Sequence, residues 1–374
     1  MNLIRVLTYL LTVFVSCVSY AWASPVYTIF DLGTLGWAGS GAMGISENGM
    51  VTGSLFGPSG SHVFIGNENG LIDLGTLGGR DAIGLAVNDS GKVVGRSDMS
   101  NGAQHAFIGD VNGLVDLGTF GGNWSQANDI NNQGQVTGSA STEGGYTHAF
   151  ISNDLGLKMD LGTLGGDVSY GTGINESGNV VGYSSVTLGA SSPRNIFTGD
   201  EFKIESLLAP GDVGAPKLSI NNKNQIAGDF VPNGFSSSTS HAFFFDGSGW
   251  EDIGTLGGKN SFSKGLNDAG QVVGHSHTVD NMHHAFLYNS SMGELFDLNS
   301  LVKDLNGWQY LQGAQDINNR GEIVGYGLTI DGYQHAFLLR EVSIPEPPTI
   351  VLFLIGALIA IRLRAFKLSP HLQT

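Results

Sequence analysis

The chain has 374 residues, of which 57 are glycine, 13% are charged and 41% are apolar. This high glycine content disfavours a helical protein, and this fraction of apolar residues disfavours disorder, so we expect a glycine-rich β protein. Between Ser24 and Ile344 there are 32 acidic and 13 basic residues, a net charge of −19. Such a surface repels phosphate backbones, so we do not expect nucleic acid as a partner.

The N-terminus has the pattern of a secretory signal peptide. Arg5 precedes an apolar run from Val6 to Val18, and the small-residue pattern Ala21-Trp22-Ala23 follows. We therefore predict a signal peptide over residues 1–23. The alternative is a retained membrane anchor, for which the apolar run is short. Because Cys17 is the sole cysteine, the processed chain has no thiol for a disulfide, a nucleophile or a metal site.

A repeat fills residues 24–342. Its units open with Asp-Leu-Gly-Thr-Leu-Gly or a variant, at Asp31, Asp73, Asp116, Asp160, Asp252 and, in degenerate form, Asp297. The interval from Asp160 to Asp252 is twice the length of the others, so we expect a degenerate repeat within it. This makes seven units of roughly 42 to 47 residues. Each unit continues with Ile-Asn, a turn that usually contains glycine, Val-Val-Gly, a variable loop and His-Ala-Phe.

These turn signals divide each unit into four short strands without helical periodicity. The pattern predicts a seven-bladed, all-β propeller of four-stranded repeats. The strand-like segment 26–30 precedes the first Asp-Leu-Gly, while the last unit stops after its third strand, 335–339. We therefore expect the N-terminal strand to complete the last blade and close the ring. An open β-solenoid is the alternative, because its repeats also bury their faces against neighbours.

The repeat resembles the extracellular HAF-repeat family, named for His-Ala-Phe. The signature occurs here at His105, His148, His241, His284 and His335. The resemblance covers nearly the whole chain between the N-terminal signal and the C-terminal tail. The first unit has His62-Val63-Phe64 instead, the fourth has Asn195-Ile196-Phe197, and the fifth lacks the glycine-rich opening. The resemblance implies export and a β-repeat fold, and it implies no known reaction.

The composition changes abruptly in the C-terminal tail, residues 343–374. Pro345-Glu346-Pro347 precedes an uncharged stretch, residues 348–361, and the basic residues that follow are Arg362, Arg364 and Lys367. An apolar segment followed by basic residues predicts a short transmembrane helix with its N-terminal side outside.

This order of parts resembles the PEP-CTERM sorting signal. In that family an exosortase, a membrane-embedded cysteine protease-transpeptidase, recognises the tail and releases or transfers the protein, often where exopolysaccharide is made. The resemblance implies that Pro345, Glu346 and Pro347 are the recognition site. It also implies a protein that is held in the cell envelope by its tail and then released to the surface. The alternative is a plain anchor that stays in the membrane, because the charge pattern is the same.

The repeated histidines and a local histidine cluster are candidates for a catalytic or metal-binding site. However, a residue that recurs in nearly every unit is explained more simply by a packing or turn hydrogen bond, because catalysis needs one distinct constellation. His275, His277 and His283 form a local cluster, in which His275 and His277 face the same way on a strand and are candidates to share a metal. Since no third ligand at motif spacing secures that site, we predict neither a metal nor another cofactor.

Two other motifs have structural interpretations. The Asp-x-Asn-x-x-Gly stretches at Asp129 and Asp316 lack the downstream carboxylate of a calcium loop, so we interpret them as Asx turns. The glycine-rich opening lacks the Lys-Ser/Thr of a phosphate loop.

Export signals, acidity and the lack of an assignable catalytic set favour a surface or matrix protein that binds glycan, exopolysaccharide or other envelope components. The alternative is a polysaccharide lyase or hydrolase at the mouth of the propeller channel. Candidate sugar platforms for it are Trp124, Trp250, Trp308 and Tyr310, although aromatic residues in an all-β core usually pack. Clustering of acids and aromatics at one channel mouth would favour the enzyme, and dispersal would count against it.

Overall fold

The computed structural model describes residues 25–152, 158–189, 194–207, 217–231 and 239–342. Within these ranges the regular secondary structure is β-strand apart from one short helix, α2 (Leu298–Leu301). No helix in the same ranges is long and apolar enough to cross a membrane. The predicted signal peptide, residues 1–23, and the predicted tail lie outside the described residues, and so do Pro345, Glu346, Pro347, Arg362, Arg364 and Lys367.

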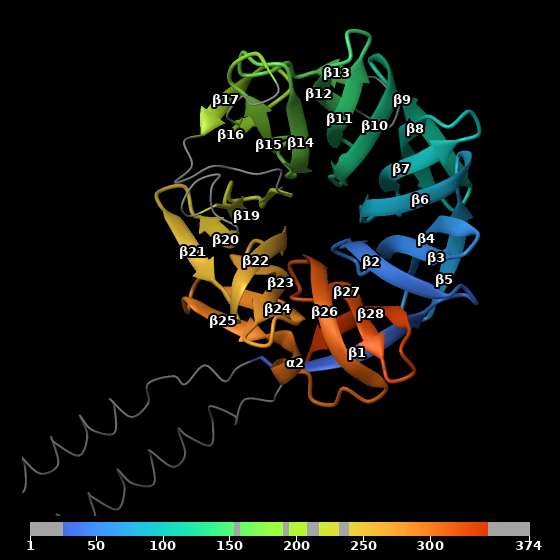
Figure 1. The fold of residues 1–374 in the computed structure, drawn as a ribbon, viewed down its shortest axis with the longest axis vertical. Helices are drawn as coiled ribbons and strands as arrows, with labels where there is room; N and C mark the ends of the chain where they lie inside the picture. Colours follow the sequence, from blue (N-terminus) through green and yellow to red (C-terminus); the bar gives the residue numbers. More distant parts are fainter. Residues whose placement is uncertain (1–24, 153–157, 190–193, 208–216, 232–238, 343–374) are drawn as a thin grey trace, which may run out of the picture.

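The strands form antiparallel groups of four around a common centre, with the first strand of each group innermost (Figure 1). The first three groups are β2 (Gly39–Ile45), β3 (Val51–Gly57), β4 (Gly60–Asn67) and β5 (Gly70–Gly75); β6 (Gly78–Val87), β7 (Val93–Met99), β8 (Gln104–Asp110) and β9 (Gly113–Gly118); and β10 (Gly121–Ile130), β11 (Val136–Thr142), β12 (Thr147–Ser152) and β13 (Lys158–Asp160). Single parallel pairings, Ser61 with Asp81 and Gln104 with Trp124, join these three groups into one twelve-stranded sheet.

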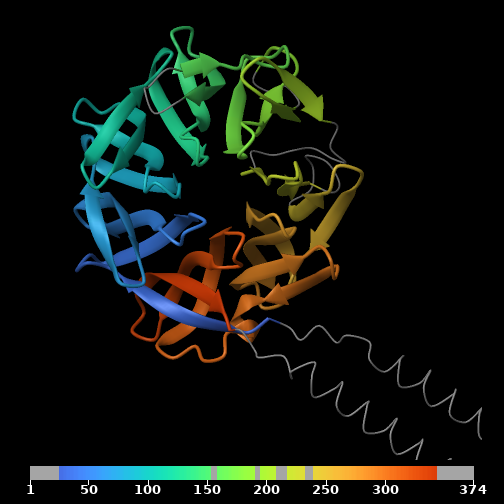
Figure 2. The same ribbon diagram turned by 180° about the vertical axis from the view of Figure 1, so that it is seen from behind.

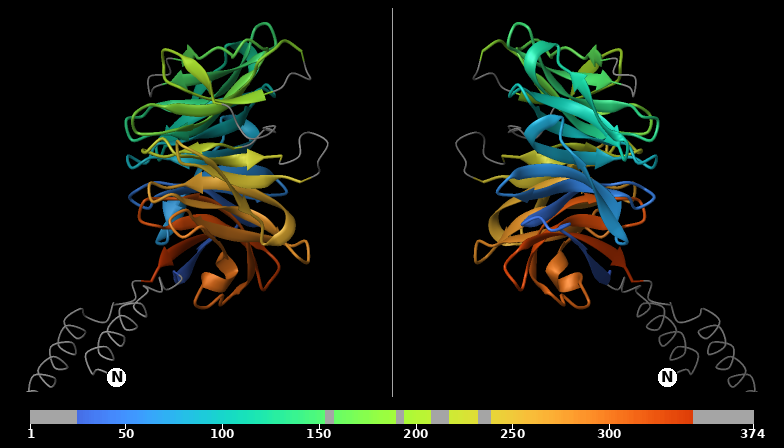
Figure 3. Two further views of the ribbon diagram at one scale, coloured as in Figure 1. Left: turned by 90° about the vertical axis from the view of Figure 1, so that its left-hand side faces the viewer. Right: turned by 90° about the vertical axis from the view of Figure 1, so that its right-hand side faces the viewer.

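The remaining groups are separate four-stranded sheets. They are β14 (Ser169–Ile174), β15 (Val180–Ser185), β16 (Arg194–Gly199) and β17 (Ile204–Leu207); β18 (Ser219–Ile220), β19 (Ile226–Phe230), β20 (His241–Phe245) and β21 (Trp250–Gly254); β22 (Gly257–Leu266), β23 (Gln271–Thr278), β24 (His283–Asn289) and β25 (Glu294–Asp297); and β26 (Trp308–Ile317), β27 (Ile323–Thr329) and β28 (Gln334–Glu341) with β1 (Tyr27–Gly33). Seen from the side, the groups are stacked against one another around the ring (Figure 3).

The two ends of the repeat meet in the last sheet. Strand β1 pairs antiparallel with β28, from Tyr27 opposite Glu341 to Gly33 opposite Ala336. The Nδ1 of His335 lies 2.8 Å from a carboxylate oxygen of Asp31, and the Ala336 N–H donates to Ser40 Oγ at 2.9 Å. The N-terminal strand is therefore the outer strand of the last group, the arrangement expected from the sequence (Figure 2).

The asparagines of the Ile-Asn motifs form hydrogen bonds from one four-stranded group to the next. Asn131 Oδ1 accepts the N–H groups of Gln133 and Gln135 in its own turn, at 3.1 and 2.9 Å. Its Nδ2 donates to the Asn175 carbonyl oxygen at 3.0 Å. The equivalent inter-sheet bonds run from Asn88 to Asn131, Asn175 to Asn221, Asn221 to Asn267, Asn267 to Asn318 and Asn318 to Ser46.

This series of asparagine hydrogen bonds closes around the ring, because Asn318 in the last group donates to the Ser46 carbonyl oxygen in the first. Ser46 has no amide to donate onward, and Asn48 Nδ2 instead donates to the Asp89 carbonyl oxygen at 2.8 Å. A chain of bonds that joins the last unit to the first excludes the open solenoid. The fold is propeller-like and all-β, as predicted.

The phenylalanine of His-Ala-Phe and the glycine of Val-Val-Gly are two parts of one packing unit. Phe107 is fully buried, and a Cβ added to Gly95 would lie 3.0 Å from its ring and 2.0 Å from the Ile83 carbonyl oxygen. No side chain fits there without moving backbone. The same close approach recurs between Gly138 and Phe150, Gly182 and Phe197, Gly274 and Phe286, and Gly325 and Phe337.

Candidate functional site

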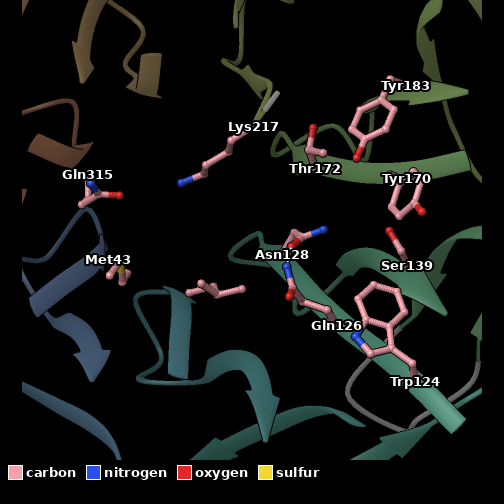
Figure 4. A pocket seen from close by; sticks show the side chains of 11 residues that line it. Met43, Trp124, Gln126, Asn128, Ser139, Tyr170, Thr172, Tyr183, Lys217 and Gln315 are labelled. Carbon is pink, nitrogen blue, oxygen red and sulfur yellow. Dashed lines mark hydrogen bonds between the residues drawn. The ribbon is translucent and has the colours of Figure 1, made fainter. Parts of the chain in front are cut away.

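A cavity of about 330 Å³ lies where the inner strands converge (Figure 4). Its lining comes from widely separated units: Met43, Leu85, Trp124, Gln126, Asn128, Ser139, Tyr170, Thr172, Tyr183, Lys217 and Gln315. Sites of this size that combine aromatic walls with a few polar groups are typical of small-ligand pockets.

One wall of the cavity is aromatic. Tyr170 on β14 and Tyr183 on β15 are directly opposite in register, and their ring centres are 4.8 Å apart at an interplanar angle of 23°. Trp124 on β10 donates from Nε1 to Gln104 Oε1 at 3.1 Å, which fixes the indole. The Arg194 guanidinium carbon lies 5.5 Å from the Tyr183 ring centre. These contacts hold the aromatic wall in place before any ligand arrives.

Polar side chains continue the wall from Trp124. Gln126 and Asn128 follow it at alternate positions of β10, so all three project to the same side. Asn128 Nδ2 donates to the Gly171 carbonyl oxygen at 2.6 Å. Ser139 lies opposite Gln126, and its fully buried Oγ has no hydrogen-bond partner within the described parts of the chain. A buried hydroxyl without a partner costs about 1–3 kcal/mol, so this Oγ is available to a ligand or a water in the cavity.

Charged groups also approach the cavity. Burial raises the pKa of Asp129 to about 7 and raises that of Asp316, while the charge of Lys217 lowers both. Asp129 accepts the N–H groups of Ile130 and, in the next sheet, Ile174, both at 2.9 Å. Both carboxylate oxygens are therefore engaged with backbone.

Asp316 makes the same pair of hydrogen bonds where the last group meets the first, since it accepts the N–H groups of Ile317 at 2.9 Å and Ile45 at 3.0 Å. The stretches that begin at Asp129 and Asp316 contain Asx turns, as interpreted from the sequence, but the turns are made by Asn131 and Asn318 two residues later. The aspartates themselves join neighbouring inner strands. The sequence could not show this, because the acceptor–donor pair spans two repeat units.

The repeated histidines have a structural partner, as predicted. Each Nδ1 lies 2.7–3.1 Å from the carboxylate of an Asp-Leu-Gly or Asp-Leu-Asn aspartate, in the pairs His62–Asp73, His105–Asp116, His148–Asp160, His241–Asp252, His284–Asp297 and His335–Asp31. In the fourth unit both partners differ, and Asn195 Nδ2 donates to Ser206 Oγ at 2.9 Å. The bond ties the third strand of each group to the fourth.

The histidine cluster has a different geometry from the one expected. His275 stacks on Phe262 with ring centres 5.0 Å apart, and burial lowers its pKa to about 3. The close contact is instead between His277 and His283, which face each other across β23 and β24 with their Nε2 atoms 3.1 Å apart. Across the described ranges, no three or more His, Cys, Asp or Glu side chains are grouped to hold a metal ion.

The four candidate sugar platforms are dispersed. Trp124 lines the cavity, Trp250 stacks on Phe245 at 4.4 Å, Trp308 is buried, and Tyr310 lies 5.7 Å from the His284 ring. Tyr170 and Tyr183 were missed. For Tyr183, comparison of the repeats contains a signal, because the residue after the Val-Val-Gly glycine is not constant among the units: Ser54, Arg96, Ser139, Tyr183, Asp229, His275 and Tyr326.

No protein-family model and no curated protein matches this sequence. Among solved structures, the chain is similar to the Pyrococcus horikoshii acylaminoacyl peptidase, with a TM-score of 0.53 and 12% identity over 84% of this chain and 53% of that one. It is also similar to YCF48 bound to D1 peptide, with a TM-score of 0.50 and 10% identity over 87% of this chain and 98% of that one. The putative TolB from Agrobacterium tumefaciens aligns at a TM-score of 0.42 and 10% identity, over 86% of this chain and 100% of that one.

At these identities the likeness shows the fold alone. The chain is an all-β protein of propeller-like architecture, which it shares with an acylaminoacyl peptidase and with YCF48, and one fold can carry many unrelated functions. Its function must therefore be argued from the cavity and its lining.

Proposed function

We propose that the chain is a seven-bladed propeller that acts by binding, with the central cavity as a site for a neutral, hydroxyl-rich ligand such as a glycan of the envelope or matrix. The observation that carries this proposal is the aromatic wall of Trp124, Tyr170 and Tyr183 beside the unpartnered hydroxyl of Ser139. Flat aromatic faces pack against the apolar faces of a sugar ring, while amide and hydroxyl groups pair with its hydroxyls.

Charge supports a neutral ligand. Among the described lining residues Lys217 is the cationic side chain, and its charge opposes the burial-raised pKa of the nearby Asp129 and Asp316. The whole chain carries a net charge of −16, which disfavours approach of a polyanion.

An enzyme acting on polysaccharide is the competing proposal, and one observation favours it. Asp129, close to Lys217, has its pKa raised to about 7, a value suited to proton transfer near neutral pH. Because both of its oxygens already accept backbone hydrogen bonds, we favour a structural role for this carboxyl. Polysaccharide cleavage by the wild type that is lost in Asp129→Asn would reverse that preference.

The binding proposal predicts that Trp124→Ala weakens glycan binding by about tenfold or more, since roughly 1.4 kcal/mol corresponds to a tenfold change. Binding is measured by calorimetry after a glycan array or a pull-down with host exopolysaccharide identifies the ligand. Tyr333→Ala is the matched control, because Tyr333 is 58% exposed and does not line the cavity. No retention of any glycan, or equal affinity in Trp124→Ala, would contradict the proposal.

We further propose that the protein is exported, is held in the envelope membrane by its C-terminal helix and is then processed by an exosortase-type enzyme. The signal pattern over residues 1–23 and the Pro345-Glu346-Pro347 tail support this. Mass spectrometry of the protein from its native host is expected to find an N-terminus at Ser24 and a C-terminus near Pro345. An intact C-terminus at Thr374 would contradict release and indicate a plain membrane anchor.

A further inference from the structure

Two imidazoles meet at the end of the hairpin formed by β23 and β24. His277 and His283 are directly opposite in the antiparallel register, their Nε2 atoms are 3.1 Å apart, and their rings are tilted by 69° with centres 4.4 Å apart. His283 is exposed, so an ion from solvent can reach the pair. Neither residue lines the central cavity.

We propose that His277 and His283 bind one transition-metal ion, such as Zn²⁺, through their Nε2 atoms. Zn–N bonds of about 2.0–2.1 Å place two ligand nitrogens about 2.9 Å apart at a right angle and about 3.4 Å apart at the tetrahedral angle. The observed separation of 3.1 Å lies between these limits, so the spacing of the two nitrogens fits one shared ion. Imidazole nitrogen is a preferred ligand of zinc, copper and nickel.

The equivalent position in other units shows that the pair is not a requirement of the fold. In the second group, Asp98 and Gln104 face each other there, and Gln104 Nε2 donates to Asp98 Oδ1 at 3.0 Å. In the third group the facing residues are Ser141 and Thr147. Two imidazoles at this register share a single N–H···N bond, whereas a metal ion uses the lone pairs of both rings.

A third ring limits the movement of the pair. The His275 ring packs beside His283 with centres 5.5 Å apart at an angle of 27° and restricts its orientation. With two protein ligands, the remaining coordination positions are left to water or to a ligand group.

The test is isothermal titration of the full chain, free of any affinity tag, with ZnCl₂. We expect one zinc per chain for the wild type. The double variant His277→Ser with His283→Thr copies the Ser141–Thr147 pair and should keep the fold while weakening zinc binding by about tenfold or more. A matched thermal unfolding curve in zinc-free buffer confirms that the double variant is folded.

A second measurement identifies the ligands directly. With Cu²⁺ in place of zinc, the electron paramagnetic resonance spectrum is expected to show coupling to two nitrogens in the wild type and to one in His283→Gln. No zinc binding by the wild type at millimolar concentration, or equal affinity in the folded double variant, overturns the proposal. Neither outcome affects the glycan proposal, because that site uses other residues.

Discussion

Phe107→Ala is expected to lower the free energy of unfolding by about 3–5 kcal/mol, the range for removing a fully buried aromatic ring. Phe107 is 0% exposed and lies against Gly95, which has no side chain to move into the space. The backbone of Ile83 borders the same space and is held by strand pairing, so the cavity cannot collapse. Chemical denaturation followed by tryptophan fluorescence measures the loss.

Phe202→Ala is the control for this variant, because Phe202 is 83% exposed. An exposed substitution of this kind changes stability by no more than about 0.5 kcal/mol. If Phe107→Ala were as stable as Phe202→Ala, the packing of Phe107 on Gly95 would not be the source of stability that the repeated phenylalanine and glycine provide. The result extends to the other units, because the same contact recurs in them.

Asp229→Asn is expected to change how stability depends on pH. Asp229 on β19 is 7% exposed, and its Oδ1 accepts the Ser263 N–H at 2.7 Å. Burial raises its pKa from 3.8 to about 7, against the opposing charge of Lys264. The asparagine keeps an oxygen acceptor for Ser263 and removes the titration.

The sign follows from proton linkage. Between pH 3.8 and about 7 the folded Asp229 holds a proton that the unfolded chain has lost, so the contribution of Asp229 to stability is largest at the acidic end of this window and falls as the pH rises. Relative to Asp229→Asn, the loss is at most about 1.4 kcal/mol per pH unit and totals a few kcal/mol. Above this window the two proteins should have parallel curves.

Denaturation midpoints and slopes measured from pH 4 to 8 give this comparison. Asp246→Asn is the matched control, since backbone hydrogen bonds lower the pKa of that exposed aspartate and its titration lies below most of the window. Parallel curves for the wild type and Asp229→Asn throughout the range would show that Asp229 is ionised in the folded protein. Asp129 and Asp316 are unchanged in both proteins and do not affect the difference.

The sequence by itself determined the class of fold, the order of strands and the place where the N-terminal strand joins the last unit. These follow from local rules: glycine and asparagine mark the turns, alternation marks the strands, and an unpaired first strand matches an incomplete last unit. It also indicated that the repeated histidines are structural, because a residue present in most units rarely forms one distinct site. The aspartate of each Asp-Leu-Gly is their partner in the structure.

Only the tertiary structure decided which residues line the cavity and which histidines touch. Trp124 and Ser139 belong to one unit, whereas Tyr170 and Lys217 belong to two others, and the proximity of the three units depends on how the sheets converge, which no spacing within a repeat encodes. His283 meets His277 because antiparallel pairing places them opposite each other, whereas alternation along one strand predicts His275 as the partner of His277. Contacts that recur in every unit leave a repeated pattern in the sequence, whereas the meeting of unit-specific side chains arises only when the ring is assembled.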